Sequence, residues 1–509
     1  MRRWALWALA VAALLGGSAI HAATSCGDLV ALTLPGIAIR STQTVAPGDF
    51  TPPGAPTSLR VRGFCRITAV AAPTPDSDIH FEVWIPSGDG WNGKLLGVGN
   101  GGFAGAIDYR AMGAALARGY AVTGTDTGHT GDQMAFGRGH PEKVADWAYR
   151  AVHVTSAAAK VMVRDLAGRF PLHSYFQGCS TGGQQALSEA QRFAEDYDGI
   201  IAGAPGNDRI RLIIGFLWSW AAMHTSSGER LLSAVQLSNL TRAAVARCDA
   251  ADGLEDGLID DPRRCEFDPG VMACKGSAND SCLTQEQIAA VRKVYAGVKN
   301  PRTGVQLFPG WARGSEAGWG SYILDPKEPV RLGLFRDLTF GDPGWDWRTF
   351  DWDRDLVFVE TQVPQLSAAS VDLERFRARG GRLLMYTGWA DPVVPPEAVV
   401  AYYEKVARAM GGLRRTHEFF RFFAAPGMGH CGGGSGPNTF DALSALEAWV
   451  ERGQPPERLL AAQSVDGKVT RTRPLCPYPT VSRYSGRGSI DTAVNFVCRA
   501  AHDPELPRG

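Results

Sequence analysis

The sequence predicts an α/β fold: a doubly wound, mostly parallel sheet with helices on both faces and a large inserted lid domain. Apolar strands alternate with helices up to about residue 206, and the alternation resumes after about residue 370. Between them, tryptophan, glycine and proline become frequent and strand signals are weak. Strand–helix alternation is typical of parallel sheets. The chain has 509 residues, which is too many for one simple core.

The individual elements support this prediction. Residues 65–85 alternate in hydrophobicity in places and indicate antiparallel edge strands. Residues 93–102 indicate an apolar strand that enters a glycine-rich loop, and residues 112–129 a helix, a strand and a polar loop. Further strands are expected over 173–178, 382–391 and 417–431, and further helices over 145–166, 182–193, 396–410 and 440–452.

The chain divides into four segments. Residues 1–22 begin with two arginines, continue with an apolar run over 5–15 and end in small residues. They predict a secretory signal peptide, because a membrane span needs about 20 apolar residues. We expect residues 23–206 and 371–509 to form the α/β domain and residues 207–370 the lid. The protein is then secreted, to the periplasm or outside the cell, with no membrane attachment once the signal is removed.

The charge balance and the cysteine content bear on which partners, metal sites and disulfides can be expected. The 52 basic and 52 acidic residues balance, which argues against a nucleic-acid partner. Ten cysteines, an even number in an exported chain, favour disulfides, and without a C-x-x-C pair a zinc ribbon is not expected. Sequence alone does not fix the connectivity. Locality suggests Cys26–Cys65, Cys248–Cys265, Cys274–Cys282 and Cys476–Cys498, which leaves Cys179 and Cys431 as the last pair.

Residues 178–182 read Gly-Cys-Ser-Thr-Gly and fit the G-x-S-x-G pattern of a nucleophile elbow. An apolar strand precedes this motif and a helix follows it, as the α/β-hydrolase fold requires. The turn lifts the serine hydroxyl clear of the sheet, so the motif predicts Ser180 as a nucleophile. The alternative is an ordinary glycine–serine loop.

A serine nucleophile needs a base and an orienting acid, and in this fold the chain order is serine, acid, histidine. Asp391 follows an apolar strand, and His430 lies in a glycine-rich loop after the last strong strand. The order Ser180, Asp391, His430 is therefore satisfied. Oxyanion donors are expected at the backbone N–H of Thr181 and at Gly102 or Gly101.

An acidic loop, "CDAADGLEDGLIDDPRRC", covers residues 248–265. Aspartates at short spacing on a turning loop suit a hard cation such as Ca²⁺, although the spacing is not that of an EF-hand. The alternative is a solvated acidic turn. The candidate ligands are the carboxylates of Asp249, Asp252 and Asp256 and the carbonyl groups of Leu254 and Leu258.

The motifs "GCSTGG", "GWADP" and "GMGHC", together with the acidic loop, resemble the tannase and feruloyl esterase family, which includes mono-hydroxyethyl-terephthalate hydrolase. The resemblance covers essentially the whole mature chain. It implies an α/β-hydrolase with a lid, Ser180 as nucleophile, His430 as base and Asp391 as acid. It also implies oxyanion donors at Gly102 and Thr181, calcium at the five loop ligands, and a Cys179–Cys431 disulfide.

The family resemblance implies a secreted serine esterase that acts on small esters of aromatic acids of the feruloyl or galloyl type. Alternatives are a terephthalate-monoester hydrolase, a non-catalytic homologue that binds aromatic ligands, and a peptidase or lipase. For a terephthalate carboxylate, Arg331 or Arg336 is the candidate partner. The candidates for holding the aromatic acyl group are Trp311, Trp319, Trp345 and Trp347.

Overall fold

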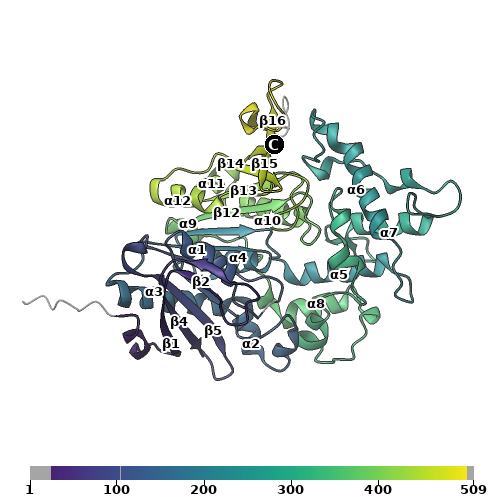
Figure 1. The fold of residues 1–509 in the computed structure, drawn as a ribbon. Helices are drawn as coiled ribbons and strands as arrows, with labels where there is room; N and C mark the ends of the chain where they lie inside the picture. Colours follow the sequence, from purple (N-terminus) through teal and green to yellow (C-terminus); the bar gives the residue numbers. More distant parts are fainter. Residues whose placement is uncertain (1–24, 104, 501–509) are drawn as a thin grey trace, which may run out of the picture.

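The computed structural model describes residues 25–103 and 105–500, so the expected signal peptide lies outside the described residues. At its centre is a nine-stranded sheet in the order β1-β4-β5-β7-β6-β8-β9-β12-β13 (Figure 1). β1, β4 and β5 pair antiparallel with their neighbours, whereas β7, β6, β8, β9, β12 and β13 run parallel. The strands span Ile37–Val45 (β1), Phe64–Ala71 (β4), Ile79–Pro86 (β5), Lys94–Val98 (β6), Ala121–Thr125 (β7), His173–Cys179 (β8), Gly199–Gly203 (β9), Arg382–Gly388 (β12) and Phe420–Ala425 (β13).

Helices cover both faces of this sheet, as the alternation of its strands requires. In β6, Leu95 packs in the apolar cluster of α3, whereas its neighbour Leu96 packs in the cluster of α1 and α12. α4 and α10 lie on the same face as α3, against Phe176 and Leu383. The predicted α/β architecture is confirmed. The helices span Tyr109–Ala117 (α1), Ala151–Ala167 (α3), Thr181–Arg192 (α4), Pro396–Ala409 (α10) and Ala442–Arg452 (α12).

A long segment is inserted between β9 and β12. Within the described chain, these residues, 204–381, add no strand to the nine-stranded sheet, and α5, α6 and α7 lie to one side of it (Figure 1). Local sequence starts two of these helices: Ser233 with Gln236, and Thr284 with Gln287, form capping boxes. The main elements are α5 (Arg209–Met223), α6 (Ala234–Cys248), α7 (Gln285–Ala296), α8 (Arg354–Gln362) and the strand pair Val298–Lys299 (β10) and Gln306–Phe308 (β11).

The last part of the chain forms two small ribbons outside the main sheet. β14 (Leu459–Val465) pairs with β15 (Lys468–Leu475), and β16 (Thr480–Tyr484) with β17 (Phe496–Ala500). β15 contacts β13, which attaches these ribbons to the edge of the sheet. None of the helices in the described residues is both long enough and apolar enough to cross a membrane.

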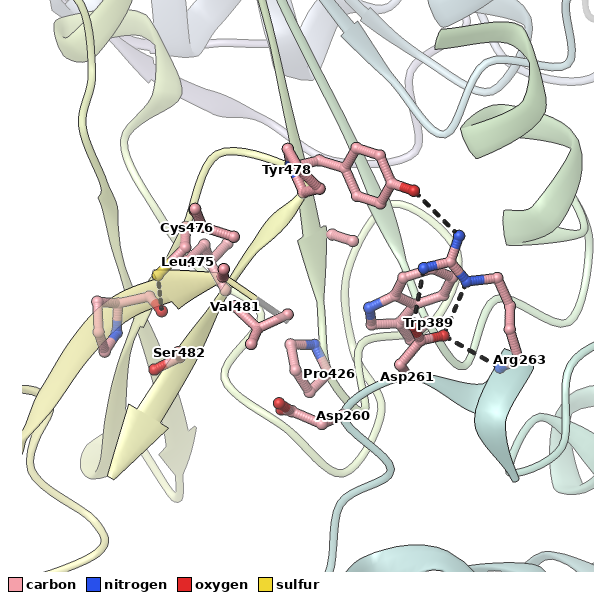
Figure 2. A pocket seen from close by; sticks show the side chains of 15 residues that line it. Asp260, Asp261, Arg263, Trp389, Pro426, Leu475, Cys476, Tyr478, Val481 and Ser482 are labelled. Atoms are coloured by element: carbon pink, nitrogen blue, oxygen red, sulfur yellow. Dashed lines mark hydrogen bonds and ion pairs between the residues drawn. The ribbon is translucent and has the colours of Figure 1, made fainter. Parts of the chain in front are cut away.

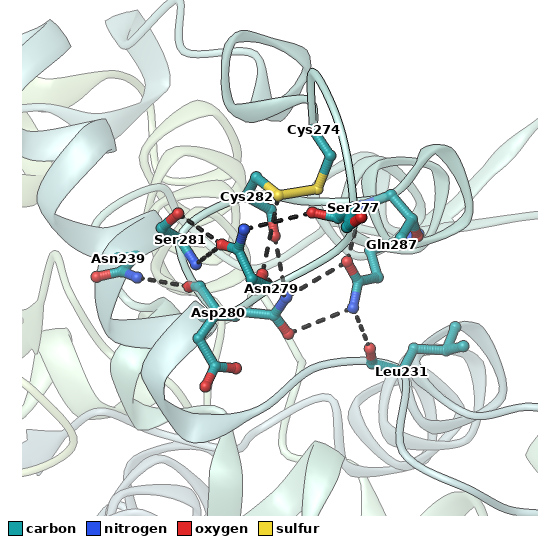
Figure 3. The surroundings of a disulfide bond; sticks show 11 residues. Leu231, Asn239, Cys274, Ser277, Asn279, Asp280, Ser281, Cys282 and Gln287 are labelled. Atoms are coloured by element: carbon teal, nitrogen blue, oxygen red, sulfur yellow. Dashed lines mark hydrogen bonds between the residues drawn. A yellow bond between two sulfur atoms is a disulfide. The ribbon is translucent and has the colours of Figure 1, made fainter.

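Five disulfides join the ten cysteines in the pairs that the sequence suggested. Cys274–Cys282, for example, closes a short loop in the inserted segment, where the Asn279 side chain accepts the Ser281 N–H at 2.8 Å (Figure 3). The pairs are Cys26–Cys65, Cys179–Cys431, Cys248–Cys265, Cys274–Cys282 and Cys476–Cys498.

Candidate active site

Ser180 lies in a sharp turn between β8 and α4. Its φ of 63° and ψ of −117° fall in a region that residues other than glycine rarely adopt. The strained turn is held by the Ser180 N–H, which donates to the Gly203 carbonyl at 2.9 Å, and by the Ser180 carbonyl, which accepts from the Gln184 N–H at 3.1 Å. The conformation is that of a nucleophile elbow.

The glycines of the motif are required because the strand and the helix approach each other very closely. A Cβ on Gly178 would lie 2.5 Å from the backbone of Gly182. A Cβ on Gly183 would lie 2.2 Å from the Gly203 carbonyl oxygen. Any side chain at these two positions would therefore push β8, β9 and α4 apart and move Ser180.

Asp391 and His430 form a hydrogen-bonded pair at the end of the parallel strands. The Asp391 carboxylate is fully buried, and its Oδ2 lies 2.8 Å from Nδ1 of His430. Its Oδ1 accepts the N–H groups of Val393 and Val394 at 2.8 and 2.9 Å. These bonds fix the carboxylate, so it orients the imidazole and favours the tautomer with the proton on Nδ1.

The Cys179–Cys431 disulfide joins the residue before Ser180 to the residue after His430. The two Cα atoms are 5.9 Å apart, although the cysteines are 252 residues apart in sequence. Cys431 has a φ of 63°, so the loop that carries His430 turns sharply at the bond. The disulfide thus restrains the elbow and the histidine loop relative to each other.

The two expected oxyanion donors lie beside the elbow. Thr181 is the first residue of α4, where a helical N–H has no partner within its own helix. The N–H of Gly102 makes no hydrogen bond among the described residues. Gly102 has a φ of 59°, and a Cβ there would lie 2.9 Å from Asp132 and 3.0 Å from Arg331. The positive φ favours glycine at 102, whereas a Cβ on Gly101 would meet open space; both glycines line the same cavity.

A cavity of about 800 Å³ contains Ser180, His430 and Gly102 in its wall. The inserted segment contributes Tyr322 to it, and the carboxyl end of β12 contributes Tyr386, whose ring packs edge-on against Phe440 at 5.0 Å. Burial raises the pKa of Tyr386 to about 12, so its hydroxyl stays neutral. Tyr386 follows the pattern of a polar group at the carboxyl end of a parallel strand, whereas no sequence signal marks Tyr322.

The tryptophans expected to hold an acyl group are placed elsewhere. Trp311 and Trp319 are 1% and 0% exposed and belong to the core. Trp345 stacks between Phe335 and Phe340, and Trp347 packs against Trp220. None of the four lines the cavity at Ser180. The expectation was wrong because large aromatic side chains in this segment gain more from burial than from exposure to a cleft.

Each of the two candidate arginines already forms an ion pair with a carboxylate of the chain. Arg331, which has a φ of 67°, lies close to Gly102 and forms an ion pair with Asp132 at 2.5 Å. Arg336 forms an ion pair with Glu328 at 2.9 Å. Only Arg331 is therefore near the elbow, and its charge is already compensated.

A second cavity, of about 230 Å³, lies where the inserted segment meets the C-terminal ribbons (Figure 2). Its main cation is Arg263, which pairs with Asp261 at 2.7 Å, donates to the Tyr478 hydroxyl at 3.2 Å and lies 5.0 Å from the Trp389 ring. Neither the elbow serine nor the paired histidine lines it. This cavity is separate from the candidate active site.

The acidic loop supplies oxygen donors of the kind that calcium prefers. Its carboxylates turn back onto their own loop: Asp249 accepts the N–H groups of Asp256 and Gly257 at 3.0 and 2.8 Å, and Asp252 accepts that of Leu254 at 3.0 Å. Asp256 also pairs with Arg473 at 2.5 Å. The described residues contain no group of three His, Cys, Asp or Glu side chains in an arrangement that could hold a metal. The donor chemistry fits a hard cation, while the carboxylates are not gathered around one point.

Comparison with known proteins identifies the family. The tannase and feruloyl esterase family model matches residues 65–499. An uncharacterized esterase of Xanthomonas campestris pv. campestris is 40% identical and covers 98% of this chain and 94% of its own length. The mono(2-hydroxyethyl) terephthalate hydrolase of Piscinibacter sakaiensis is 32% identical, over 83% of this chain and 82% of the relative.

Solved structures agree. Feruloyl esterase B from Aspergillus oryzae superposes with a TM-score of 0.87 at 29% identity, over 92% of this chain and 98% of that chain. The expected resemblance and the α/β-hydrolase fold are thereby confirmed. The chain belongs to the tannase and feruloyl esterase family and is a carboxylic ester hydrolase.

Proposed function

We propose that this esterase works through a covalent acyl-enzyme on Ser180. The observation that carries the proposal is that Ser180, held in an elbow, and His430, bonded to the buried Asp391, line one cavity. With Nδ1 donating to Asp391, Nε2 of His430 has a free lone pair. Ser180 Oγ attacks the ester carbonyl carbon while Nε2 takes its proton.

The intermediate carries its negative charge on the former carbonyl oxygen. The N–H groups of Gly102 and Thr181 stabilise that charge, each by about 3–4 kcal/mol. Collapse breaks the bond to the alcohol, which leaves with the proton from His430 and leaves the acyl group on Ser180. A water molecule then attacks this ester, His430 takes the water proton, and the free acid departs while the proton returns to Ser180.

The acyl group we propose is that of an aromatic acid, of the feruloyl or galloyl type. Tyr322, Tyr386 and Phe440 line the cavity, and aromatic walls favour aromatic ligands. A cavity of about 800 Å³ is large enough for such an ester. Relatives named as feruloyl esterases cover most of this chain and support the same class.

The runner-up is a terephthalate monoester, which the similarity to the Piscinibacter hydrolase favours. Its free carboxylate needs a cation, and of the two candidate arginines Arg331 lies beside Gly102. Because Asp132 already neutralises Arg331, the terephthalate-monoester hypothesis is weaker than the feruloyl or galloyl one. A non-catalytic homologue is weaker still, because it has no need for the bonded Asp391–His430 pair.

We further propose that the protein is exported and that residues 207–370 form a lid over the active site. The signal-like residues 1–22 and the five disulfides support export, because disulfides persist in oxidising compartments. Tyr322, which the inserted segment brings to the cavity of Ser180, supports the lid.

We also propose that calcium binds the acidic loop. Asp249, Asp252 and Asp256 would supply carboxylates and Leu254 and Leu258 carbonyl oxygens, an all-oxygen set on a turning loop. Calcium would stabilise the inserted segment there. Its role is structural, since none of these residues lines the cavity of Ser180.

The acyl preference is tested with a panel of methyl ferulate, methyl gallate, chlorogenate, mono(2-hydroxyethyl) terephthalate and methyl hexanoate. We expect kcat/KM for the best hydroxy-aromatic ester to exceed that for the hexanoate by about tenfold or more, because contacts that one substrate lacks discriminate by about 1–3 kcal/mol. Equal rates for the aliphatic ester contradict the proposal. The highest rate on the terephthalate ester selects the runner-up.

Replacing the nucleophile tests the mechanism. Ser180→Ala should lower kcat for methyl ferulate by about 10⁴-fold or more, because the covalent route is lost. Circular dichroism and Tm should stay close to those of the wild type. Turnover by a folded Ser180→Ala protein at a rate near the wild type would falsify the acyl-enzyme on this serine.

The disulfide beside the site is tested by Cys179→Ala with Cys431→Ala. Closing so long a loop is worth about 5 kcal/mol in the chain-entropy model, so Tm should fall. In the fraction that remains folded, kcat should fall further than the secondary-structure content, because the elbow and the histidine loop are no longer joined. The matched control is Cys274→Ala with Cys282→Ala, whose short loop lies away from the cavity. Equal kcat values in both double variants would rule out a role in catalysis.

Calcium is tested by metal analysis and melting. We expect about one bound Ca²⁺ per chain, a lower Tm after chelation, and recovery on addition of Ca²⁺ but not of Mg²⁺. Asp252→Asn should abolish the response to chelation, whereas Asp268→Asn, an exposed control paired with Arg292, should keep it. A wild-type Tm that is the same with chelator and with calcium excludes the site.

A further inference from the structure

Arg209 is a buried arginine that forms no ion pair with an acidic residue in the described part of the chain. It is the first residue of α5 and only 5% exposed, and no carboxylate within the described residues forms an ion pair with it. By contrast, Arg211 in the same helix is half-exposed and pairs with Glu360 at 2.8 Å. Burying a charge without a counter-charge is costly, so such residues are generally held by hydrogen bonds or have a functional role.

The guanidinium group of Arg209 is held between the elbow helix and the oxyanion loop. Its Nε donates to Gln184 Oε1 at 2.7 Å, and its Nη2 donates to Thr181 Oγ1 at 2.8 Å. It lies 5.3 Å from the ring of Phe103 and 5.8 Å from that of Trp147. These rings stack on each other, and the cation lies within cation–π distance of both.

The charge is retained at neutral pH. Burial, and to a smaller extent the nearby Arg331, lower the pKa of Arg209 to about 9. A guanidinium with this pKa is still protonated at pH 7. A fixed positive charge therefore lies directly behind Thr181.

The chemistry of the groups fixes which one donates and which one accepts in the hydrogen bonds between Arg209, Thr181 and Gly102. A guanidinium group only donates, so the Thr181 hydroxyl must accept from Arg209. Its single hydrogen is then free to point elsewhere, and it is directed to the carbonyl oxygen of Gly102. The chain Arg209 to Thr181 to Gly102 thus links the two residues whose N–H groups are the proposed oxyanion donors.

We infer that Arg209 is the positioning residue of the oxyanion hole: through the Thr181 hydroxyl it fixes the Gly102 and Thr181 peptides, and its buried charge favours the anionic intermediate. This inference rests on the proposed acyl-enzyme mechanism. The effect belongs to the transition state, because negative charge develops there and not in the bound ester. A purely structural Arg209 would change stability and leave kcat of the folded enzyme unchanged.

The test compares Arg209→Met with Arg211→Met, a matched control on the same helix. Kinetics on methyl ferulate are combined with inhibition by phenylboronic acid, which forms a tetrahedral anion on a reactive serine. Arg209→Met should lower kcat by about tenfold or more, somewhat less than complete loss of one donor. KM should change little, and the boronic acid should bind more weakly by a similar factor. Arg211→Met should match the wild type in all three.

These experiments distinguish failure of the acyl-enzyme mechanism from failure of the inference about Arg209. Wild-type enzyme that phenylboronic acid does not inhibit, or a Ser180→Ala protein that turns over, removes the mechanism and the inference with it. If the mechanism stands but folded Arg209→Met keeps the wild-type kcat and boronic acid affinity, only the inference is overturned.

A second pair of variants covers the case in which Arg209→Met does not fold. Thr181→Val removes the hydroxyl of the relay, and Thr181→Ser keeps it. We expect Thr181→Val to lose kcat and boronic acid affinity together, and Thr181→Ser to be clearly faster than Thr181→Val. Where Arg209→Met does fold, the losses in the double variant Arg209→Met with Thr181→Val should not add, since both substitutions act through one chain of bonds. Equal kcat for the valine and serine variants, or additive losses, overturns the inference.

Discussion

The close approach of β8 and α4 is the constraint on which the active site depends. A Cβ on Gly178 would lie 2.5 Å from the backbone of Gly182, so the strand and the helix can come this close only because residue 178 is glycine. In the turn between them, Ser180 adopts a positive φ of 63°. Backbone hydrogen bonds to neighbouring elements hold this strained turn. The turn places Ser180 in the wall of a cavity and the Thr181 N–H at the start of a helix.

Two buried charges of opposite sign flank this turn. On one side Asp391, fully buried, is bonded by two backbone N–H groups and holds His430. On the other side Arg209 holds Thr181. The arrangement suits a reaction in which the histidine becomes positive while the carbonyl oxygen becomes negative, because each fixed charge lies on the side where the opposite charge develops. The Cys179–Cys431 disulfide joins the parts that carry the serine and the histidine.

Much of the fold and of the candidate site could be predicted from sequence, because the relevant signals are local. The G-x-S-x-G motif specifies its own turn, and the chain order of the α/β-hydrolase fold selects Asp391 and His430. Short separations indicated most of the cysteine pairs. The residue pattern left Gly101 and Gly102 open as the second oxyanion donor, and only the structure shows the positive φ that favours glycine at 102.

The inserted segment was harder to predict, because its contacts are between distant parts of the chain. In the sequence, Trp311 and Trp319 cannot be told apart from aromatic residues that bind a ligand. The structure shows that packing buries both side chains in the core. Tyr322 reaches the cavity through a fold that no motif encodes. Arg209 belongs to no pattern either, since its partners come from the oxyanion loop and the elbow helix. Such residues become visible only when tertiary contacts place them together.

Product partitioning is the most direct measure of whether hydrolysis passes through an acyl-enzyme. Methyl ferulate and 4-nitrophenyl ferulate differ only in the alcohol that leaves before the acyl-enzyme reacts. With ethanol added as a competing acceptor, we expect the same ratio of ethyl ferulate to ferulic acid from both esters. A ratio that depends on the leaving alcohol would contradict a common acyl-enzyme.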